Sequence, residues 1–264
     1  MINLAELCEA CCLVAASVGR FIRQELGRVE GQQVETKSLN SLVSYVDKQA
    51  EEQLVQALSA LLPESGFLTE EGTVAEDSSQ ALRWIIDPLD GTTNFLHQVP
   101  IFSISIALQQ AGEIVLGVVY EANRQECFYA WKGGGAFLNG QPIRVSGQTQ
   151  LADSLLATGF PYYDYGHLSA YLRILEYFVQ HTRGIRRLGS AAVDLAYTAC
   201  GRFDGFYEYG LHAWDLAAGV LLVQEAGGKV SDFKGGDDYL FGEELIAASP
   251  AIWEDMQACI GQAI

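Results

Sequence analysis

Apolar residues recur every three or four positions at the start of the chain, and this spacing predicts an amphipathic helix. Its apolar face comprises Leu4, Leu7, Cys8, Cys11, Ala15, Val18 and Ile22. The same period predicts a second helix over residues 46–61, which ends before Pro63 because proline cannot donate a backbone N–H. The intervening residues 27–40 are polar and contain glycine, so we expect a mobile loop between the two helices.

Short apolar runs predict a set of strands in the next part of the chain. Residues 84–86 are typical of a buried strand, and residues 101–108 alternate as in a half-exposed strand. Further apolar runs precede Asn139-Gly140, a typical hairpin turn. The first part of the chain therefore predicts helices packed on a largely antiparallel sheet.

The pattern changes near residues 145–154, after which short apolar strands alternate with helices. Ser190 can cap one of these helices, and Gly201 can end it. Such alternation is typical of a layered α/β unit. We therefore expect an α+β half over residues 1–147 and an α/β half over residues 148–264.

The net charge of the chain limits the kinds of molecule that it is expected to bind. The 264 residues are 49% hydrophobic and 19% charged, which excludes a mostly disordered protein. Lys and Arg number 16 against 33 Asp and Glu, a net charge of −17. A surface this negative repels nucleic-acid phosphates and anionic lipids, so we expect neither as a partner. The same carboxylates suit a hard divalent cation.

Membrane and disulfide signals are weak. No apolar run reaches the roughly 18 residues that a bilayer requires, and Glu6 and Glu9 precede the longest run, where a secretory signal would carry Lys or Arg. Cys8 and Cys11 form a C-x-x-C pair without a second pair or a nearby His, so we interpret them as small apolar residues on a helix face. These observations predict a reduced, cytoplasmic protein.

The most informative segment is residues 87–95, which read DPLDGTTNF. It follows a buried strand, at the edge where open sheets usually carry ligand sites. A turn after Pro88 can bring two carboxylates and the Leu89 carbonyl into one cavity, and these are the hard oxygen ligands that Mg²⁺ prefers. Residues 91–93 can open a helix whose free N–H groups bind an anion. An ordinary Asp-Gly turn explains part of this pattern, but not the coincidence of acids, proline and hydroxyls.

Five segments in the same order resemble the inositol monophosphatase family of the carbohydrate phosphatase superfamily. They are VSYVD (43–47), EEG (70–72), DPLDGTTNF (87–95), GGGAFLNG (133–140) and WDLAAG (214–219). The resemblance covers nearly the whole chain. It implies a layered αβαβα fold, in which the first half binds metal and the second completes the site, and it implies a homodimer.

The resemblance also implies two or three Mg²⁺ ions per subunit. Glu70, Asp87 and the Leu89 carbonyl would hold the first ion. Asp87, Asp90 and Asp215 would hold the second, so that Asp87 bridges the two. Phosphoryl transfer requires mainly positioning and charge neutralisation, which such a cluster supplies.

Catalytic roles follow from the same resemblance. A hydrogen-bonded pair of Thr92 and Asp47 would orient and deprotonate the attacking water near Glu70, and the N–H groups of Gly91 and Thr92 would hold the phosphate. Asp47 has an alternative role, because Ser44-x-x-Asp47 matches a helix capping box.

Thr93-Asn94-Phe95 resembles the branch that hydrolyses inositol monophosphates, and this implies myo-inositol 1-phosphate or a similar polyol phosphate as substrate, with inhibition by Li⁺. The residues that would contact the polyol are Asp90, Gly189, Ser190, Ala191, Glu208 and Asp215. Two alternatives stay open: a fructose-1,6-bisphosphatase or other sugar phosphatase, and a non-catalytic partner of the transcription machinery.

Several positions depart from the family pattern or lie outside it. Thr69 precedes the acidic pair where the family commonly has a smaller residue, and residues 159–164 are closer to bacterial members, which leaves the sugar specificity open. Lys37 lies where the family has an active-site lysine. Arg183, Arg186 and Arg187 form a basic cluster that we interpret as a solvated face or subunit contact. Asp194 and Asp204 are rival acids that no motif supports.

Overall fold

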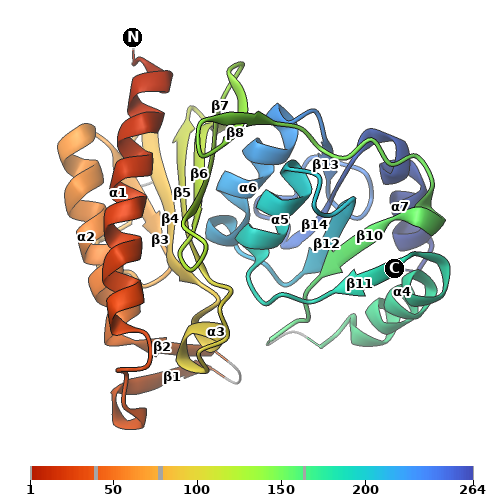
Figure 1. Cartoon of the computed structure of the whole chain (residues 1–264), viewed down its shortest axis with the longest axis horizontal. Helices are drawn as coiled ribbons and strands as arrows, with labels where there is room; N and C mark the ends of the chain where they lie inside the picture. The colour runs from red at the N-terminus through yellow and green to blue at the C-terminus, as the bar shows by residue number, and fades with distance from the viewer. Residues whose placement is uncertain (1, 39–40, 77–79, 163–164, 264) are drawn as a thin grey trace.

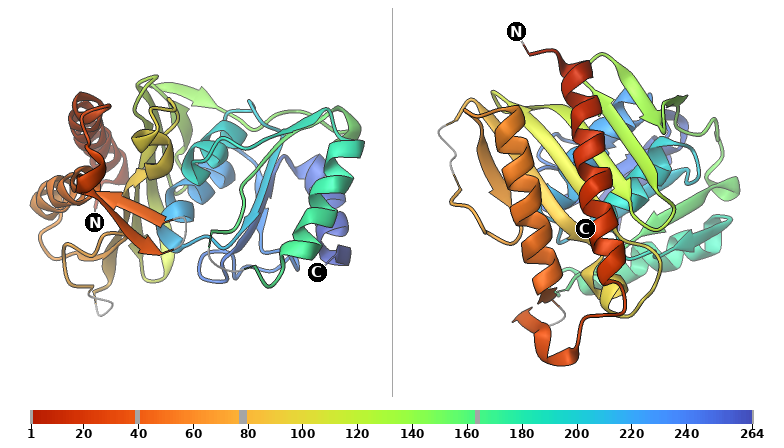
Figure 2. Two further views of the ribbon diagram at one scale, coloured as in Figure 1. Left: turned by 90° about the horizontal axis from the view of Figure 1, so that it is seen from below. Right: turned by 60° about the vertical axis from the view of Figure 1, so that its left-hand side comes forward.

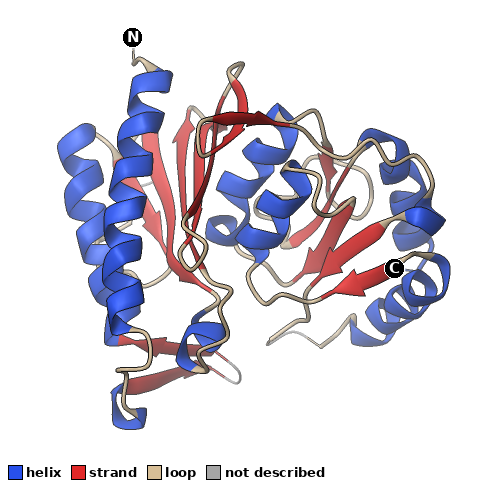
Figure 3. Ribbon diagram, in the orientation of Figure 1, coloured by secondary structure: helices blue, strands red, loops and turns tan. Residues whose placement is uncertain are grey.

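Five alternating layers of helices and sheets make up the molecule (Figure 1). The computed structural model describes residues 2–38, 41–76, 80–162 and 165–263. The helix pairs are α1 (Leu4–Glu25) with α2 (Tyr45–Leu61), α5 (Ala191–Ala199) with α6 (Ala213–Glu225), and α4 (Leu168–His181) with α7 (Pro250–Ala263). A sheet separates each pair from the next, as Figure 3 shows in blue and red. The predicted αβαβα arrangement is confirmed.

The first sheet has seven strands in the order β3-β4-β5-β6-β7-β8-β9. Their bounds are Gly66–Thr69, Leu82–Asp90, Ser103–Gln110, Glu113–Glu121, Glu126–Trp131, Gly135–Leu138 and Gln141–Ile143. Only β3 and β4 pair in parallel, so the prediction of a largely antiparallel sheet is confirmed. The predicted hairpin turn joins β8 to β9, with positive φ angles of 48° at Asn139 and 82° at Gly140.

The second sheet has five strands in the order β11-β10-β12-β14-β13. Their bounds are Gly184–Arg186, Leu155–Thr158, Gly205–Tyr209, Glu244–Ala248 and Lys229–Ser231. Strand β10 runs parallel to both its neighbours, whereas β14 is antiparallel to β12 and β13. Helices α5 and α6 belong to this half of the chain but also pack on the first sheet. The division at residues 147 and 148 stays a prediction.

The apolar face predicted for the first helix is buried in α1. Residues Leu7, Cys8, Cys11, Ala15, Val18 and Ile22 are all below a tenth exposed, and they pack with α2 against the first sheet. Figure 2 shows α1 and α2 side by side across this face. The interpretation of Cys8 and Cys11 as apolar helix residues is therefore confirmed. Within the described ranges, no helix is long and apolar enough to cross a bilayer.

The expectation of a half-exposed strand over residues 101–108 is wrong. Strand β5 is buried at every residue except its last, because helices cover both faces of the sheet. Its small polar residues face the middle helix layer instead of water. Ser103 Oγ lies 3.1 Å from Ser190 Oγ, and Ser105 Oγ donates to the Trp214 carbonyl at 2.9 Å.

The loop predicted over residues 27–40 is also partly wrong. It contains a short 3₁₀ helix, η1 (Gly31–Gln33), and strand β1 (Val34–Ser38), which pairs antiparallel with β2 (Ser41–Ser44). Residues 39 and 40, and the side chain of Lys37, lie outside the described part of the chain. A two-stranded sheet buries little apolar surface, which is why its residues read as a loop.

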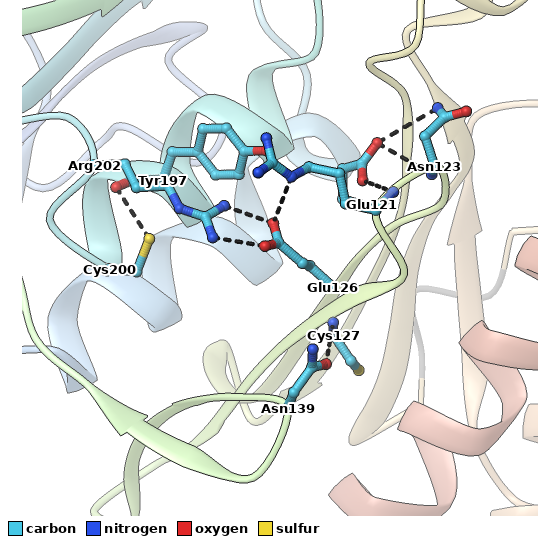
Figure 4. Close-up of polar contacts among 9 residues, drawn as sticks. Glu121, Asn123, Glu126, Cys127, Asn139, Tyr197, Cys200 and Arg202 are labelled. Atoms are coloured by element: carbon cyan, nitrogen blue, oxygen red, sulfur yellow. Dashed lines mark hydrogen bonds and ion pairs between the residues drawn. The ribbon is translucent and has the colours of Figure 1, made fainter.

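An ion pair fixes the end of α5 against the first sheet (Figure 4). The Arg202 guanidinium donates to both Glu126 oxygens, each at 2.6 Å, and lies 4.5 Å from the centre of the Tyr197 ring. The pair lowers the pKa of Glu126 through these hydrogen bonds. Bidentate geometry of this kind is stronger than a single contact, so β7 and α5 are joined firmly. The opposite end of α5 begins at the site described below.

Candidate active site

The acidic segment lies at the C-terminal end of strand β4, at the edge of the first sheet. Its pairing with β5 is irregular between Asp87 and Asp90, where three steps on β4 oppose two on β5. This bulge accommodates Pro88, which has no N–H for the ladder. Gly91 then adopts φ 95°, and a Cβ there would lie 3.1 Å from the carbonyls of Ile101 and Gly189, so only glycine fits. As predicted, a short helix, α3 (Thr92–Leu96), follows.

Helix α6 brings a third acid to the same place. Asp215 lies in the first turn of α6 and accepts the His212 N–H at 2.7 Å. One carboxylate oxygen from each of Asp87, Asp90 and Asp215 lies within 4.8 Å of the other two. The structure therefore brings together three acids that the sequence analysis expected to share a pocket.

These acids line a cavity of about 460 Å³ that both halves of the chain enclose. Its lining also contains the predicted site residues Glu70, Leu89, Gly91, Thr92, Gly189, Ser190, Ala191 and Glu208. Asp47 is buried behind this lining and reaches the cavity through Thr92. Every residue predicted for the site thus lies in the cavity or in contact with a residue that does.

The acids strongly perturb one another. Burial raises the pKa of Asp87 well above its usual range, and the charges of Glu70, Asp90 and Asp215 raise it further. Burial likewise raises the pKa of Asp90 to about 6, and that of Asp215 well above normal. Converging carboxylates of this kind are stabilised by a cation. The donors are all oxygens, so the residues present fit Mg²⁺.

The raised carboxyl pKa values predict how stability depends on pH. A carboxyl group whose pKa is higher in the folded than in the unfolded state takes up a proton on folding when the pH lies between those two values. The free energy of unfolding therefore falls as the pH rises through this interval. Burial raises the pKa of Asp90 to about 6 and that of Glu208 to about 8. We therefore expect the melting temperature of the protein in EDTA to fall by several degrees from about pH 5 to about pH 8. Thermal melts with and without Mg²⁺ check this, and a flat or rising curve in EDTA would contradict it.

Asp47 makes the contacts of both alternatives that the sequence left open, the helix cap and the pair with Thr92. Its Oδ2 accepts the N–H and the hydroxyl of Ser44, at 2.8 and 2.7 Å, which completes the capping box of α2. Its Oδ1 accepts the Thr92 hydroxyl at 2.8 Å. Burial raises the pKa of Asp47, and the hydrogen bonds with Ser44 and Thr92 oppose this rise. The capping box therefore fixes the carboxylate that holds Thr92 in place.

Ser190 has a role that the sequence analysis missed. Its hydroxyl donates to Asp90 Oδ2 at 2.6 Å, and the Ala192 N–H donates to the same oxygen at 2.8 Å. Ser190 also caps α5, as predicted, by accepting the Val193 N–H. The start of α5 therefore orients Asp90. The sequence signals only the cap, because Ser190 and Asp90 are far apart in the chain.

The members of the arginine cluster lie in different surroundings, and the interpretation of the cluster as a solvated face or subunit contact stays a prediction. Arg187 lines the cavity, and its guanidinium lies 5.6 and 5.8 Å from the ring centres of Tyr162 and Phe160. Arg183 instead pairs with exposed Asp153 at 3.0 Å. Arg187 thus gives this mostly acidic cavity a positive group. The sequence carries no local signal that separates the two arginines.

Two further carboxyl groups, those of Glu208 and Asp194, line the cavity. Glu208 is only 5% exposed, and burial is the main cause of its raised pKa. A Cβ on Gly159 would come within 1.9 Å of Glu208 Oε1, so glycine leaves room for this carboxylate. Asp194 is buried in the cavity wall, and its Oδ1 has no hydrogen-bond partner. Asp204 lies elsewhere and accepts the Leu155 N–H at 2.7 Å.

The comparisons agree with this geometry. The five layers are those expected for the carbohydrate phosphatase fold, and the Thermotoga maritima IMPase structure shares the fold with a TM-score of 0.87. The chain belongs to the inositol monophosphatase family, whose sequence profile matches residues 3–264. It is 45% identical to an inositol-1-monophosphatase of Mesorhizobium japonicum over 90% of each chain.

Other similar proteins carry the name SuhB. The chain is 45% identical to the Nus factor SuhB of Pseudomonas aeruginosa over 89% of its own length and 88% of the relative's. It is also similar to the crystal structure of the extragenic suppressor protein suhB from Bartonella henselae. That similarity has a TM-score of 0.93 and 40% identity, and it covers 98% of this chain and 100% of the other.

Proposed function

We propose that the protein is a Mg²⁺-dependent phosphomonoesterase that hydrolyses myo-inositol 1-phosphate or a similar polyol phosphate to the alcohol and inorganic phosphate. The observation that carries the proposal is the convergence of Asp87, Asp90 and Asp215 oxygens within 4.8 Å in one cavity. Family membership supports the phosphatase class. We extend the proposal to two or three Mg²⁺ ions per subunit, sensitivity to Li⁺ and a cytoplasmic homodimer.

The three acids, with Glu70 and the Leu89 carbonyl, would hold the cations. Bound Mg²⁺ would supply charge neutralisation at the phosphate and would make a coordinated water more acidic. Leu89 is well placed for this role, because its N–H donates to Asp87 Oδ1 at 2.8 Å and so fixes the turn between them.

Thr92 and Asp47 would activate the attacking water. The Thr92 hydroxyl donates to Asp47 Oδ1, which leaves the threonine lone pairs free to accept a hydrogen from water in the cavity. Asp47 can then accept the proton, because its Oδ1 lies 2.8 Å from the Thr92 hydroxyl oxygen. We propose that the N–H groups of Gly91 and Thr92 hold the phosphate beside this pair.

The polyol would lie toward the second half of the chain. Glu208 faces the cavity there, together with Gly189, Ser190 and Ala191. A carboxyl group accepts hydrogen bonds from hydroxyls, and its protonated form, which the raised pKa of Glu208 favours, can also donate one. We therefore propose Glu208 as the main contact with the polyol hydroxyls.

A phosphate-release assay with Mg²⁺ tests the proposed function. The panel contains myo-inositol 1-phosphate, fructose 1,6-bisphosphate and p-nitrophenyl phosphate, and we expect the highest kcat/KM for the inositol ester. Faster turnover of the bisphosphate would overturn the substrate assignment, and no release from any ester would overturn the enzyme class.

Glu208→Gln tests the polyol contact separately. A hydrogen bond between neutral groups contributes about 0.5–1.5 kcal/mol, so we expect the KM for inositol 1-phosphate to rise roughly two- to tenfold. Hydrolysis of p-nitrophenyl phosphate should change little, because this ester has no polyol hydroxyls. An equal loss for both substrates would show that Glu208 does not contact the polyol.

A second candidate function comes from the relatives named Nus factor SuhB. In this alternative, the chain acts as a partner of the transcription machinery, and the cavity need not perform chemistry. The Asp90→Asn variant separates the two, as argued in the Discussion.

A further inference from the structure

A buried carboxylate outside the cavity lining holds the loop that carries Glu70. Glu51 lies on α2 and is fully buried. Its Oε1 accepts the Thr69 hydroxyl at 2.9 Å, the Thr73 N–H at 2.7 Å and the Thr73 hydroxyl at 2.8 Å. Its Oε2 accepts the Glu71 N–H at 2.8 Å. All four donors belong to residues 69–73, the segment that leaves the first sheet after β3.

These hydrogen bonds involve the residues on both sides of Glu70 in the chain, Thr69 before it and Glu71 after it. The Glu70 N–H itself bonds the carbonyl of Ile86, the residue before Asp87, at 3.2 Å. Beyond this point the chain leaves the pairing of β3 with β4, which ends at Thr69 and Ile86. The backbone after Glu70 is therefore held by Glu51, and not by the sheet.

The position of Glu70 matters for the acidic cluster. Glu70 lines the same cavity as Asp87, Asp90 and Asp215. A displacement of the loop would thus change the number and the spacing of the oxygens that face a cation. Coordination by Mg²⁺ is sensitive to such changes, because the ion requires nearly ideal octahedral geometry.

One helix face carries both supports of the site. Asp47 and Glu51 are four residues apart on α2, so they lie on the same side of the helix. Asp47 holds Thr92, and Glu51 holds the Glu70 loop. We propose that Glu51 is a positioning residue that sets the affinity of the site for its divalent cation, an inference that rests on the proposed function. The Thr69 departure from the family pattern fits this role, since its hydroxyl adds a donor to Glu51.

Glu51→Gln is the main test. The amide keeps the size of the side chain but replaces one acceptor oxygen by a donor NH₂, which must then face at least one hydrogen-bond donor of the loop. Variants of residues that orient metal ligands typically lose 10–100-fold in metal affinity. We expect the Kd for Mg²⁺, measured by calorimetry without substrate, to rise about tenfold. The matched control is Glu52→Gln, which changes the exposed neighbour on the same helix.

Two more readouts separate positioning from general stability. Hydrogen exchange should speed up at the amides of residues 71 and 73 in Glu51→Gln and not in the control. Phosphate release should need more Mg²⁺ for half-maximal rate, while kcat at saturating Mg²⁺ stays within a few-fold of the parent chain. A folded Glu51→Gln variant with unchanged Mg²⁺ affinity would overturn the proposal.

A milder variant covers the case in which Glu51→Gln does not fold. Thr73→Val removes one hydroxyl donor and keeps the N–H, and we expect a rise of two- to threefold, or more, in the Kd for Mg²⁺. Unchanged affinity in this variant would overturn the proposal by itself. If the parent chain binds no Mg²⁺, the proposed metal site fails together with the inference. If the parent chain binds Mg²⁺ and the variants bind it with the same affinity, the inference alone fails.

Discussion

Asp90→Asn is expected to lower phosphate release roughly 10³-fold or more while the protein stays folded. One Asp90 oxygen already accepts the Ser190 hydroxyl and the Ala192 N–H. The amide must therefore place its NH₂ either against these donors or toward the position of the cation. Both arrangements remove the negative charge that a divalent ion needs.

Stability should move in the opposite direction from activity. The raised pKa of Asp90 shows that its ionised form is unfavourable in this buried cluster. Removing the charge relieves repulsion with Asp87 and Asp215, so we expect the melting temperature in EDTA to stay equal or rise. Asp237→Asn, which changes an exposed acid, is the matched control for both measurements.

The outcome also decides between the two candidate functions. An Asp90→Asn variant that retains a tenth or more of the parent activity would contradict the proposed metal site. A variant without phosphatase activity that still binds the transcription machinery would favour the alternative that the SuhB-named relatives raise. The same preparation serves both assays, so a folding defect cannot imitate either result.

Thr92→Ala is expected to reduce kcat roughly 10²-fold with little change in KM. The variant removes the hydroxyl that joins Asp47 to the cavity, so water is no longer oriented or deprotonated by the pair. Thr92→Ser keeps the hydroxyl and should recover most of the activity. Steady-state kinetics of both variants with inositol 1-phosphate measures the effect.

Asp47→Asn tests whether the two residues act as a unit. If they do, the double variant Asp47→Asn, Thr92→Ala should lose no more activity than the worse single variant. Asp47→Asn should also lower stability by about 1 kcal/mol, because Asp47 caps α2 through Ser44. Thr92→Ala lacks this cost. Additive losses of activity, or a Thr92→Ala variant with normal kcat, would contradict the proposed pair.

Local patterns predicted the elements of the fold well, and the errors have a common cause. The period of the first helix and the Asn139-Gly140 turn depend on contacts within a few residues. The alternation of apolar and polar residues in β5 is equally clear, but the polar residues face a helix layer and not water. Ser105 bonds the carbonyl of Trp214, which belongs to another layer. No pattern within β5 reveals that a helix layer from the second half covers it.

In the candidate site, too, local sequence predicted some residues and only the tertiary structure revealed the others. The segment DPLDGTTNF predicted a turn with converging oxygens, since proline, glycine and the acids are neighbours in the chain. The resemblance to a family supplied Asp215, which no local rule connects to Asp87. Nothing in the sequence analysis pointed to Arg187 in the cavity or to Glu51 behind the Glu70 loop. Both act through side-chain contacts between distant segments.

The sequence by itself determined where helices, turns and the acidic segment lie, because these depend on period, capping and turn chemistry over short stretches. The tertiary structure decided which distant groups meet: Glu51 with the loop at Glu71, and Ser190 with Asp90. Such meetings depend on how two sheets and three helix layers pack. The physical reason is that burial removes water as a partner, so each buried polar group must bond whichever segment the packing brings to it.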